Sequence, residues 1–299
     1  MPRTGVLFIL LTATLLACDL LNPEPKPGTS EAEFESPALG AVPVLNAPSL
    51  REASGLAASR TNAGLLWAHN DSGDLPRLFL LGPDGNQRAE FTVEGTAGNY
   101  DWEDLAATNR SGQPTVFIAD IGDNTGVRAN CLIYRFAEPT YASGTTGTVR
   151  GVEKITFQYP DGVKHDAETL LVDHQTGDLY VLSKEASRTR VYRLPFPQAT
   201  TGVITAEKLG ELPLAFLTAG DISPDNSEVI LKSYTEVFYW KRQAGESLLA
   251  TLNRPARKLP YLAEPAGEGL AFAADGSGYF TLSEAIEGIQ PRLFFYKRK

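Results

Sequence analysis

Short apolar runs that alternate with turns rich in Gly, Asp and Asn recur along most of the chain. In five segments, a small or acidic residue opens an apolar run, a turn follows, and a second apolar run returns. The opening residues are Ser54, Glu103, Glu168, Gly220 and Glu268. They recur at roughly 50- to 65-residue intervals, close to the period of four-stranded propeller blades. The pattern therefore predicts a repeated blade.

Each repeat continues with a third run rich in aromatic and β-branched residues, a composition typical of strands. A fourth run follows in the first four repeats, at residues 90–93, 155–158, 206–209 and 248–251. The fifth repeat ends with three runs, and residues 42–45 supply the missing one. We predict an all-β fold, a five-bladed β-propeller of four-stranded antiparallel blades closed by an N-terminal strand. Six blades are the alternative, because the longest interval has room for further strands.

The N-terminus reads as a targeting segment. Arg3 precedes an apolar run over residues 5–17, which has the length of a secretory signal rather than of a membrane-spanning helix. The run ends at Leu15, Leu16, Ala17 and Cys18, which resembles the lipobox of bacterial lipoproteins. The resemblance implies cleavage before Cys18 and a lipid on its sulfur. It places the protein in the bacterial cell envelope, anchored to a membrane outside the cytoplasm, in the periplasm or at the cell surface.

The domain boundaries follow from this assignment. Residues 1–17 are expected to be a lipoprotein signal peptide and residues 18–40 a flexible, Pro-rich tether that begins with the lipidated Cys18. Residues 41–299 are expected to form the propeller. The formal net charge is −9 and basic residues cluster only at the C-terminal end, so a nucleic-acid partner is not expected. Two cysteines are too few for a disulfide framework.

The opening residues of the five repeats carry the candidate chemistry. The first strand of each propeller blade lines the channel, so these residues converge on one ring. Three glutamates near one axis repel one another unless they are solvated, protonated or bound to a cation. Oxygen ligands of mixed type suit Ca²⁺ better than Mg²⁺, and the lack of Cys and His in the ring argues against Zn²⁺. We predict Ca²⁺ held by Ser54, Glu103, Glu168, Gly220 and Glu268, the competing interpretation being a channel mouth lined by solvated acids.

The order Ser, Glu, Glu, small residue, Glu resembles the central Ca²⁺ site of the calcium-activated nucleotidase (apyrase) family, which are five-bladed propellers. The resemblance covers Ser54, Glu103, Glu168 and Glu268. That family has Ser where this chain has Gly220, so a ligand there would be a backbone carbonyl or a neighbour such as Thr218 or Asp221. Over nearly the whole domain, the chain is similar to bacterial secreted propellers of the SdiA-regulated and phytase-associated esterase-like kind. Residues 69–74, 101–104, 120–124 and 165–168 carry this second resemblance.

Polar residues after the second runs are expected to surround the ring on the same face. His69, His165 and Asp101 are the candidates for general acid and base chemistry. The candidate contacts to a small polar or anionic ligand are Asn70, Asp120, Asp123, Asn124, Arg128, Lys184 and Lys232. The competing interpretation is that Asp, Asn and Gly after a strand are ordinary turn residues.

Two functions remain open at this point. One is a ligand- or partner-binding module at the cell envelope with a central Ca²⁺ site. The other is a Ca²⁺-dependent hydrolase of phosphoesters or other esters, nucleotidase-like or phytase/esterase-like, in which the metal polarises an oxygen. The sequence has no Gly-x-Ser-x-Gly, P-loop, His-Glu-x-x-His or Cys-x-x-Cys motif. This favours the binding module, whose protein partner, if it has one, the sequence does not identify.

Overall fold

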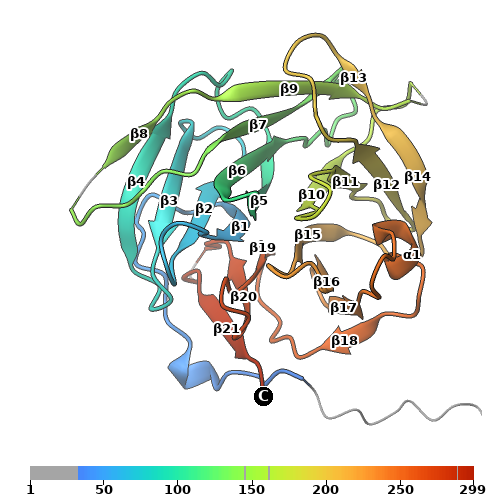
Figure 1. Cartoon of the computed structure of the whole chain (residues 1–299). Helices are drawn as coiled ribbons and strands as arrows, with labels where there is room; N and C mark the ends of the chain where they lie inside the picture. The colour runs from blue at the N-terminus through green and yellow to red at the C-terminus, as the bar shows by residue number, and fades with distance from the viewer. Residues whose placement is uncertain (1–32, 145, 161, 288) are drawn as a thin grey trace, which may run out of the picture. The chain divides into compact units, whose positions relative to one another are not determined.

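The structure is a computed structural model that describes residues 33–144, 146–160, 162–287 and 289–299. Its strands form five small, mainly antiparallel sheets arranged in a ring, a five-bladed β-propeller (Figure 1). The prediction of five blades is confirmed, and the six-blade alternative is wrong. Cys18, the signal peptide and most of the predicted tether lie outside the described residues. Within the described ranges, no helix is both long and apolar enough to cross a membrane.

Each blade runs outward from the channel in chain order. Blade 1 contains β1 (Ala53–Ala58), β2 (Leu66–Asn70), β3 (Arg77–Leu81) and β4 (Gln87–Val93). Blade 2 contains β5 (Trp102–Arg110), β6 (Gln113–Asp120), β7 (Cys131–Ala137) and β9 (Glu153–Gln158). Blade 3 contains β10 (Ala167–Val172), β11 (Leu179–Ser183), β12 (Thr189–Leu194) and β14 (Glu207–Leu212). Blade 4 contains β15 (Leu217–Ile222), β16 (Glu228–Ser233), β17 (Val237–Lys241) and β18 (Arg257–Leu259). Blade 5 contains β19 (Gly267–Phe272), β20 (Gly278–Ser283) and β21 (Leu293–Lys297).

The longest interval between repeats contains a short strand that belongs to another blade. Strand β8 (Gly147–Val149) pairs in parallel with the outer strand of blade 1, although it lies between two strands of blade 2 in the sequence. Strand β13 (Ile204–Thr205) likewise pairs in parallel with β9 of the preceding blade. These additions cover the outer edges of two sheets, where unpaired backbone groups would otherwise be exposed. The extra sequence therefore provides edge cover and not another blade.

The N-terminal segment closes the ring against the last blade. Val44 forms an antiparallel bridge with Arg292, and Phe34 forms another with Arg298 near the end of β21. These are two isolated bridges and not a continuous strand over residues 42–45; Pro43, inside that segment, has no N–H to donate. Phe34 is only 1% exposed. The predicted boundary at residue 41 is therefore wrong, because the folded domain already includes the segment from residue 33.

One predicted strand is a helix. Residues 248–251 were expected to be the outer strand of blade 4, but Leu248–Leu252 form the short helix α1. The side chain of Ser247 caps its N-terminus by accepting a hydrogen bond from the Ala250 N–H. Leu248, Thr251 and Leu252 are buried, which is a helical spacing that a short apolar run does not distinguish from a strand. The outer strand of this blade is β18, a few residues further on.

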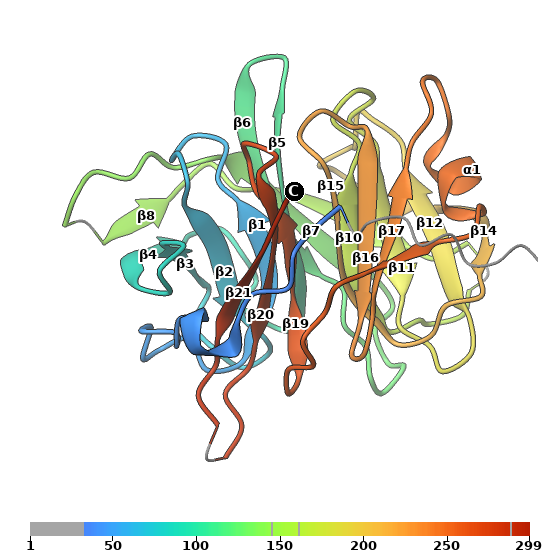
Figure 2. The same ribbon diagram turned by 90° about the horizontal axis from the view of Figure 1, so that it is seen from below.

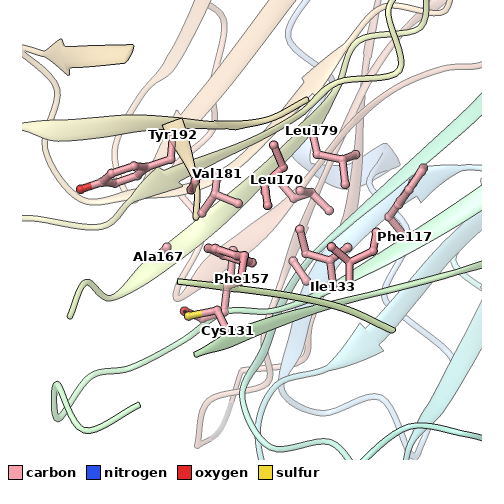
Figure 3. Packing of buried hydrophobic residues seen from close by; sticks show 14 of the residues in the cluster. Phe117, Cys131, Ile133, Phe157, Ala167, Leu170, Leu179, Val181 and Tyr192 are labelled. Atoms are coloured by element: carbon pink, nitrogen blue, oxygen red, sulfur yellow. The ribbon is translucent and has the colours of Figure 1, made fainter. Parts of the chain in front are cut away.

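Apolar side chains fill the spaces between neighbouring blades. Between blades 2 and 3, Phe117, Ile133 and Phe157 pack towards Leu170 and Val181 (Figure 3). Buried carboxylates also tie adjacent inner strands together. The Asp104 carboxylate accepts from the Leu170 N–H at 2.9 Å, and the Asp221 carboxylate accepts from the Phe272 N–H at 2.8 Å. These bonds hold the inner strands in a fixed relation around the channel.

Candidate functional site

The inner strands share a break in register at the end of the channel where they begin. In each blade, one residue near the start of the inner strand bulges out of the pairing with the second strand. The blades can be aligned on the inner-strand residue that pairs with the third-to-last residue of the second strand. In chain order, these residues are Leu56, Leu105, Leu170, Gly220 and Leu270. Counting back two residues gives the equivalent ring positions, which are Ser54, Glu103, Glu168, Thr218 and Glu268. Four of the five predicted ring residues are therefore at equivalent positions.

The fourth member of the predicted ring is corrected by this register. Gly220 lies two residues beyond the ring, and a Cβ there would meet Leu231, Leu171 and Thr169. Its lack of a side chain serves packing between blades 3 and 4. Thr218 occupies the ring position instead. The sequence suggested Gly220 because the acidic residue that follows it, Asp221, resembles the acidic residues that open other repeats. In the structure, the Asp221 carboxylate instead accepts a hydrogen bond from the next inner strand.

The two hydroxyl residues of the ring hold neighbouring blades together. Ser54 Oγ donates to the Glu103 carbonyl at 2.5 Å, and Thr218 Oγ1 donates to the Gly267 carbonyl at 3.2 Å. Both side chains are buried. The ring therefore combines two hydroxyls that bond to backbone with three glutamates whose charges need other partners.

Three carboxylates form a compact cluster on the side of blades 1 and 2. Asp71, Asp101 and Glu103 each offer an oxygen, and these oxygens all lie within 4.8 Å of one another. Asp71 directly follows β2, whereas Asp101 directly precedes β5. Glu103 is buried, and the two aspartates are partly exposed. We call these three residues the acidic triad.

Gly122 makes room for this cluster. A Cβ at residue 122 would overlap Glu103 Oε1 and the carboxylate of Asp101. The Gly122 N–H donates to the Asp101 carbonyl at 3.3 Å, which holds the backbone against the triad. The sequence placed this glycine in a turn string, but its requirement comes from packing against two carboxylates. A site for an oxygen-bound cation fits this cradle.

Electrostatics of the triad favour a bound cation. Burial raises the pKa of Glu103 well above its ordinary value, and the charges of Glu168, Asp71 and Asp101 add to the rise. Burial, with smaller contributions from Glu268 and Asp101, raises the pKa of Asp71 to about 6. The positive charge of Arg128 acts on Asp101, but the ion pair of Arg128 is with Asp120 at 2.7 Å. The triad therefore concentrates negative charge that a divalent cation would stabilise.

The opposite side of the ring already contains a cation. The Lys184 ammonium forms an ion pair with Glu168 Oε1 and lies 5.3 Å from the centre of the Tyr234 ring. The Tyr234 hydroxyl donates to Glu268 Oε1 at 3.0 Å. Glu284 hydrogen-bonds to the Glu268 side chain, and its pKa is raised to about 9 by burial and by the charge of Glu268. We call Glu168, Glu268 and Glu284 the second acid group.

The two candidate catalytic histidines are enclosed by protein. His69 is fully buried beside Ser54, with Nδ1 2.9 Å from the Asn70 carbonyl. Burial lowers its pKa to about 4. His165 is 6% exposed, with Nδ1 3.4 Å from Glu185 and its ring against Tyr159 at 4.9 Å. Asp101 is therefore the one predicted catalytic residue that joins the triad.

Three of the predicted ligand-binding residues organise loops. The Asn70 side chain accepts from the Arg51 N–H and the Glu52 N–H. Asp123 accepts from the backbone N–H groups of Val127 and Arg128. Asp120 is fully buried and paired with Arg128. Asp120 and Asp123 shape the 121–130 connection that carries Gly122, whereas Asn70 holds the segment before β1.

The remaining predicted contacts divide into exposed and buried groups. Asn124 is exposed, and the Arg128 guanidinium lies 4.8 Å from the ring centre of Tyr100, which is itself exposed. Lys232 is fully buried: its ammonium lies 3.7 Å from Glu264 and donates to the Gly267 carbonyl. Lys232 is thus part of a buried ion pair, whose partner the sequence did not suggest. A buried ion pair of this kind stabilises the fold only while both partners are present.

The raised pKa values predict how stability depends on pH. Asp71 and Glu284 hold their protons to higher pH in the folded state than in the unfolded chain. Between the ordinary carboxylate range and pH 9, the folded state therefore binds more protons, so the free energy of unfolding falls as the pH rises. Buried His69 gives the opposite slope below about pH 6.5, so we expect the melting temperature in chelator to fall as the pH rises from there to pH 9. Added Ca²⁺ is expected to reverse most of the fall at the alkaline end. Metal-free stability that rises over this range would contradict the burial of these carboxyls.

The comparisons with known proteins give no basis for assigning a function. A scan against models of protein families matches none of them, and a search of the curated proteins finds no match to this chain. The fold and the acidic triad are therefore the basis for the functional argument.

Proposed function

We propose that this protein is a lipid-anchored, extracytoplasmic β-propeller that binds one hard divalent cation at one end of its channel. The acidic triad of Asp71, Asp101 and Glu103 carries the proposal, because its three oxygens lie within 4.8 Å of one another. Ca²⁺ is the proposed ion, since carboxylate oxygens in adjustable geometry suit it. Bound there, it would neutralise the triad and offer open coordination positions to a ligand.

Two observations support a binding module over a hydrolase. His69 has no solvent exposure, and burial lowers its pKa to about 4, so it is a poor proton donor or acceptor for an incoming ligand. His165 is enclosed by Glu185 and Tyr159. Beside the triad, the exposed ring of Tyr100 lies against the largely buried Arg128 guanidinium, and this pair suits contact with an aromatic or anionic ligand. The hydrolase remains the second candidate because Asp101 is partly exposed within the triad.

The membrane anchor is part of the same proposal. It rests on the lipobox-like sequence that ends at Cys18. Metabolic labelling of the full chain with a fatty acid tests it: the wild type is expected to take up label, and Cys18→Ser is expected to take up none. Labelling that survives the substitution would contradict the anchor.

The cation site is tested by melting the full chain after treatment with chelator. At free Ca²⁺ about 100-fold above its dissociation constant, a site present only in the folded state adds about 2.7 kcal/mol. For a domain of this size, the melting temperature is then expected to rise by roughly 5 to 10 °C. No rise at any Ca²⁺ concentration would contradict the proposal.

Gly122→Ala is expected to damage the site without unfolding the protein. Its Cβ would push Glu103 and Asp101 apart. Overpacking of this kind costs about 1 to 3 kcal/mol, so Ca²⁺ affinity is expected to fall about 10- to 100-fold in calorimetric titration.

Gly40→Ala is the matched control, because nothing lies within 4 Å of the added Cβ. It is expected to bind Ca²⁺ like the wild type. Unchanged affinity in Gly122→Ala would show that the cation does not use Glu103 and Asp101 together.

A further inference from the structure

The channel mouth is asymmetric in how its acids are neutralised. On the side of blades 1 and 2, no Lys or Arg among the described residues forms an ion pair with the acidic triad, although the charge of Arg128, which is paired with Asp120, acts on Asp101. On the side of blades 3, 4 and 5, the second acid group contacts the Lys184 ammonium, the Tyr234 hydroxyl and a proton carried by Glu284. Each side combines ring glutamates with acids from the adjoining connections: Glu103 lies with Asp71 and Asp101, and Glu168 and Glu268 lie with Glu284. The difference is therefore a lysine ammonium in direct contact with a ring glutamate.

Lys184 lies in the position that a metal ion would take between these acids. Its ammonium contacts Glu168 Oε1 and shares a hydrogen bond with Tyr234, which in turn donates to Glu268. Only 16% of the Lys184 side chain is exposed, so the charge is held in place by the loop that follows β11. The charge of Glu168 raises the pKa of Lys184 above its ordinary value despite the opposing effect of burial. The ammonium thus stays charged over the physiological range.

One carboxylate oxygen of Glu168 is available to bind a cation. Glu168 Oε2 is buried and has no hydrogen-bond partner within the part of the chain that the structure describes. Glu168 is 2% exposed, and the charges of Glu268 and Asp166 act on it together with that of Lys184. A buried carboxylate oxygen without a donor is costly, and a metal ion is one of the groups that satisfy such an atom.

We propose that Lys184 occupies a second cation position, formed by Glu168, Glu268 and Tyr234, and thereby limits the channel mouth to one divalent cation. The inference rests on the proposed function for the first site but concerns a different set of ligands. Removing the ammonium leaves carboxylate and phenol oxygens around a buried position, which is the oxygen-rich environment that Ca²⁺ takes. Lys184 is a tethered substitute for the second metal, and it sets the stoichiometry of the site.

The test is a calorimetric titration of the full chain with Ca²⁺ alone, after chelator has been removed. The wild type is expected to bind one equivalent. Lys184→Met, which keeps the length of the side chain and removes its charge, is expected to bind two. Lys164→Met is the matched control, because it removes a positive charge from the same face, where Lys164 donates to the Val127 carbonyl. It is expected to bind one equivalent.

The outcomes separate the two proposals. One equivalent in a folded Lys184→Met protein overturns the inference and leaves the proposed function intact. No binding by the wild type together with one equivalent in Lys184→Met overturns the proposed function and supports the inference. If Lys184→Met does not fold, Lys184→Gln retains a donor for Glu168 and is expected to gain the same additional equivalent. A folded Lys184→Gln with wild-type stoichiometry also overturns the inference.

Discussion

Glu103→Gln is expected to abolish the Ca²⁺-dependent rise in melting temperature and to make the metal-free protein more stable. Glutamine has nearly the same shape but no charge, so it removes both the cost of burying a carboxylate and the repulsion from Glu168 and Asp71, which together raise the pKa of Glu103. It also removes one of three charged ligands of the triad. Affinity for Ca²⁺ falls steeply as ligand charge is lost, and we expect a loss of about 100-fold or more. The opposite signs of the two effects distinguish a ligand from a residue that merely supports the fold.

Glu287→Gln provides the control. Glu287 is exposed in the β20–β21 connection, which projects from the ring (Figure 2). The substitution changes the net charge equally, so it is expected to leave both the metal-free melting temperature and the Ca²⁺ response unchanged. Calorimetric titration and thermal melting of both variants measure the difference. A Glu103→Gln protein that binds Ca²⁺ like the wild type would remove Glu103 from the site.

Phe34→Ala is expected to lower the free energy of unfolding by about 3 to 5 kcal/mol, as is usual for loss of a buried phenylalanine. Phe34 is 1% exposed, and its ring meets Tyr279 at 5.1 Å and Tyr239 at 6.2 Å, both edge-on. The guanidinium of Arg298 lies 4.6 Å from the centre of the same ring. Phe34 thus fastens the segment that closes blade 5 against blade 4. Chemical denaturation of the full chain measures the loss.

Leu39→Ala is the control for the Phe34→Ala substitution. Leu39 belongs to the same N-terminal segment but is 64% exposed, so its truncation is expected to change the free energy of unfolding by less than about 0.5 kcal/mol. Equal, small effects of the two substitutions would show that the segment around residue 34 does not stabilise the propeller.

The number of blades was predictable because five repeats carry the same order of apolar runs and turns. The details that failed depend on contacts outside each repeat. The run at 248–251 forms a helix because its buried positions and its cap suit one, and four residues are too few to reveal the period. Gly220 was misplaced by two residues because small and acidic residues recur both at the ring and in the ties between blades.

The candidate site was predictable in part. Glu103 and Asp101 were identified from the repeat starts and their surroundings, and both belong to the acidic triad. Asp71 lies in a turn string, and turn composition does not show which carboxylate faces the channel. Sequence also gave no indication that Lys232 would be buried against Glu264, because Lys232 lies in β16 and Glu264 lies in the connection between β18 and β19. Pairings of this kind depend on tertiary packing, which one sequence does not contain.

A crystal structure of the full chain determined with saturating Ca²⁺ tests the central claim most directly. The account predicts one ion bound to oxygens of Asp71, Asp101 and Glu103 at about 2.3 to 2.6 Å, with the Lys184 ammonium still on Glu168. Water alone between the three carboxylates at that Ca²⁺ concentration would contradict the cation site.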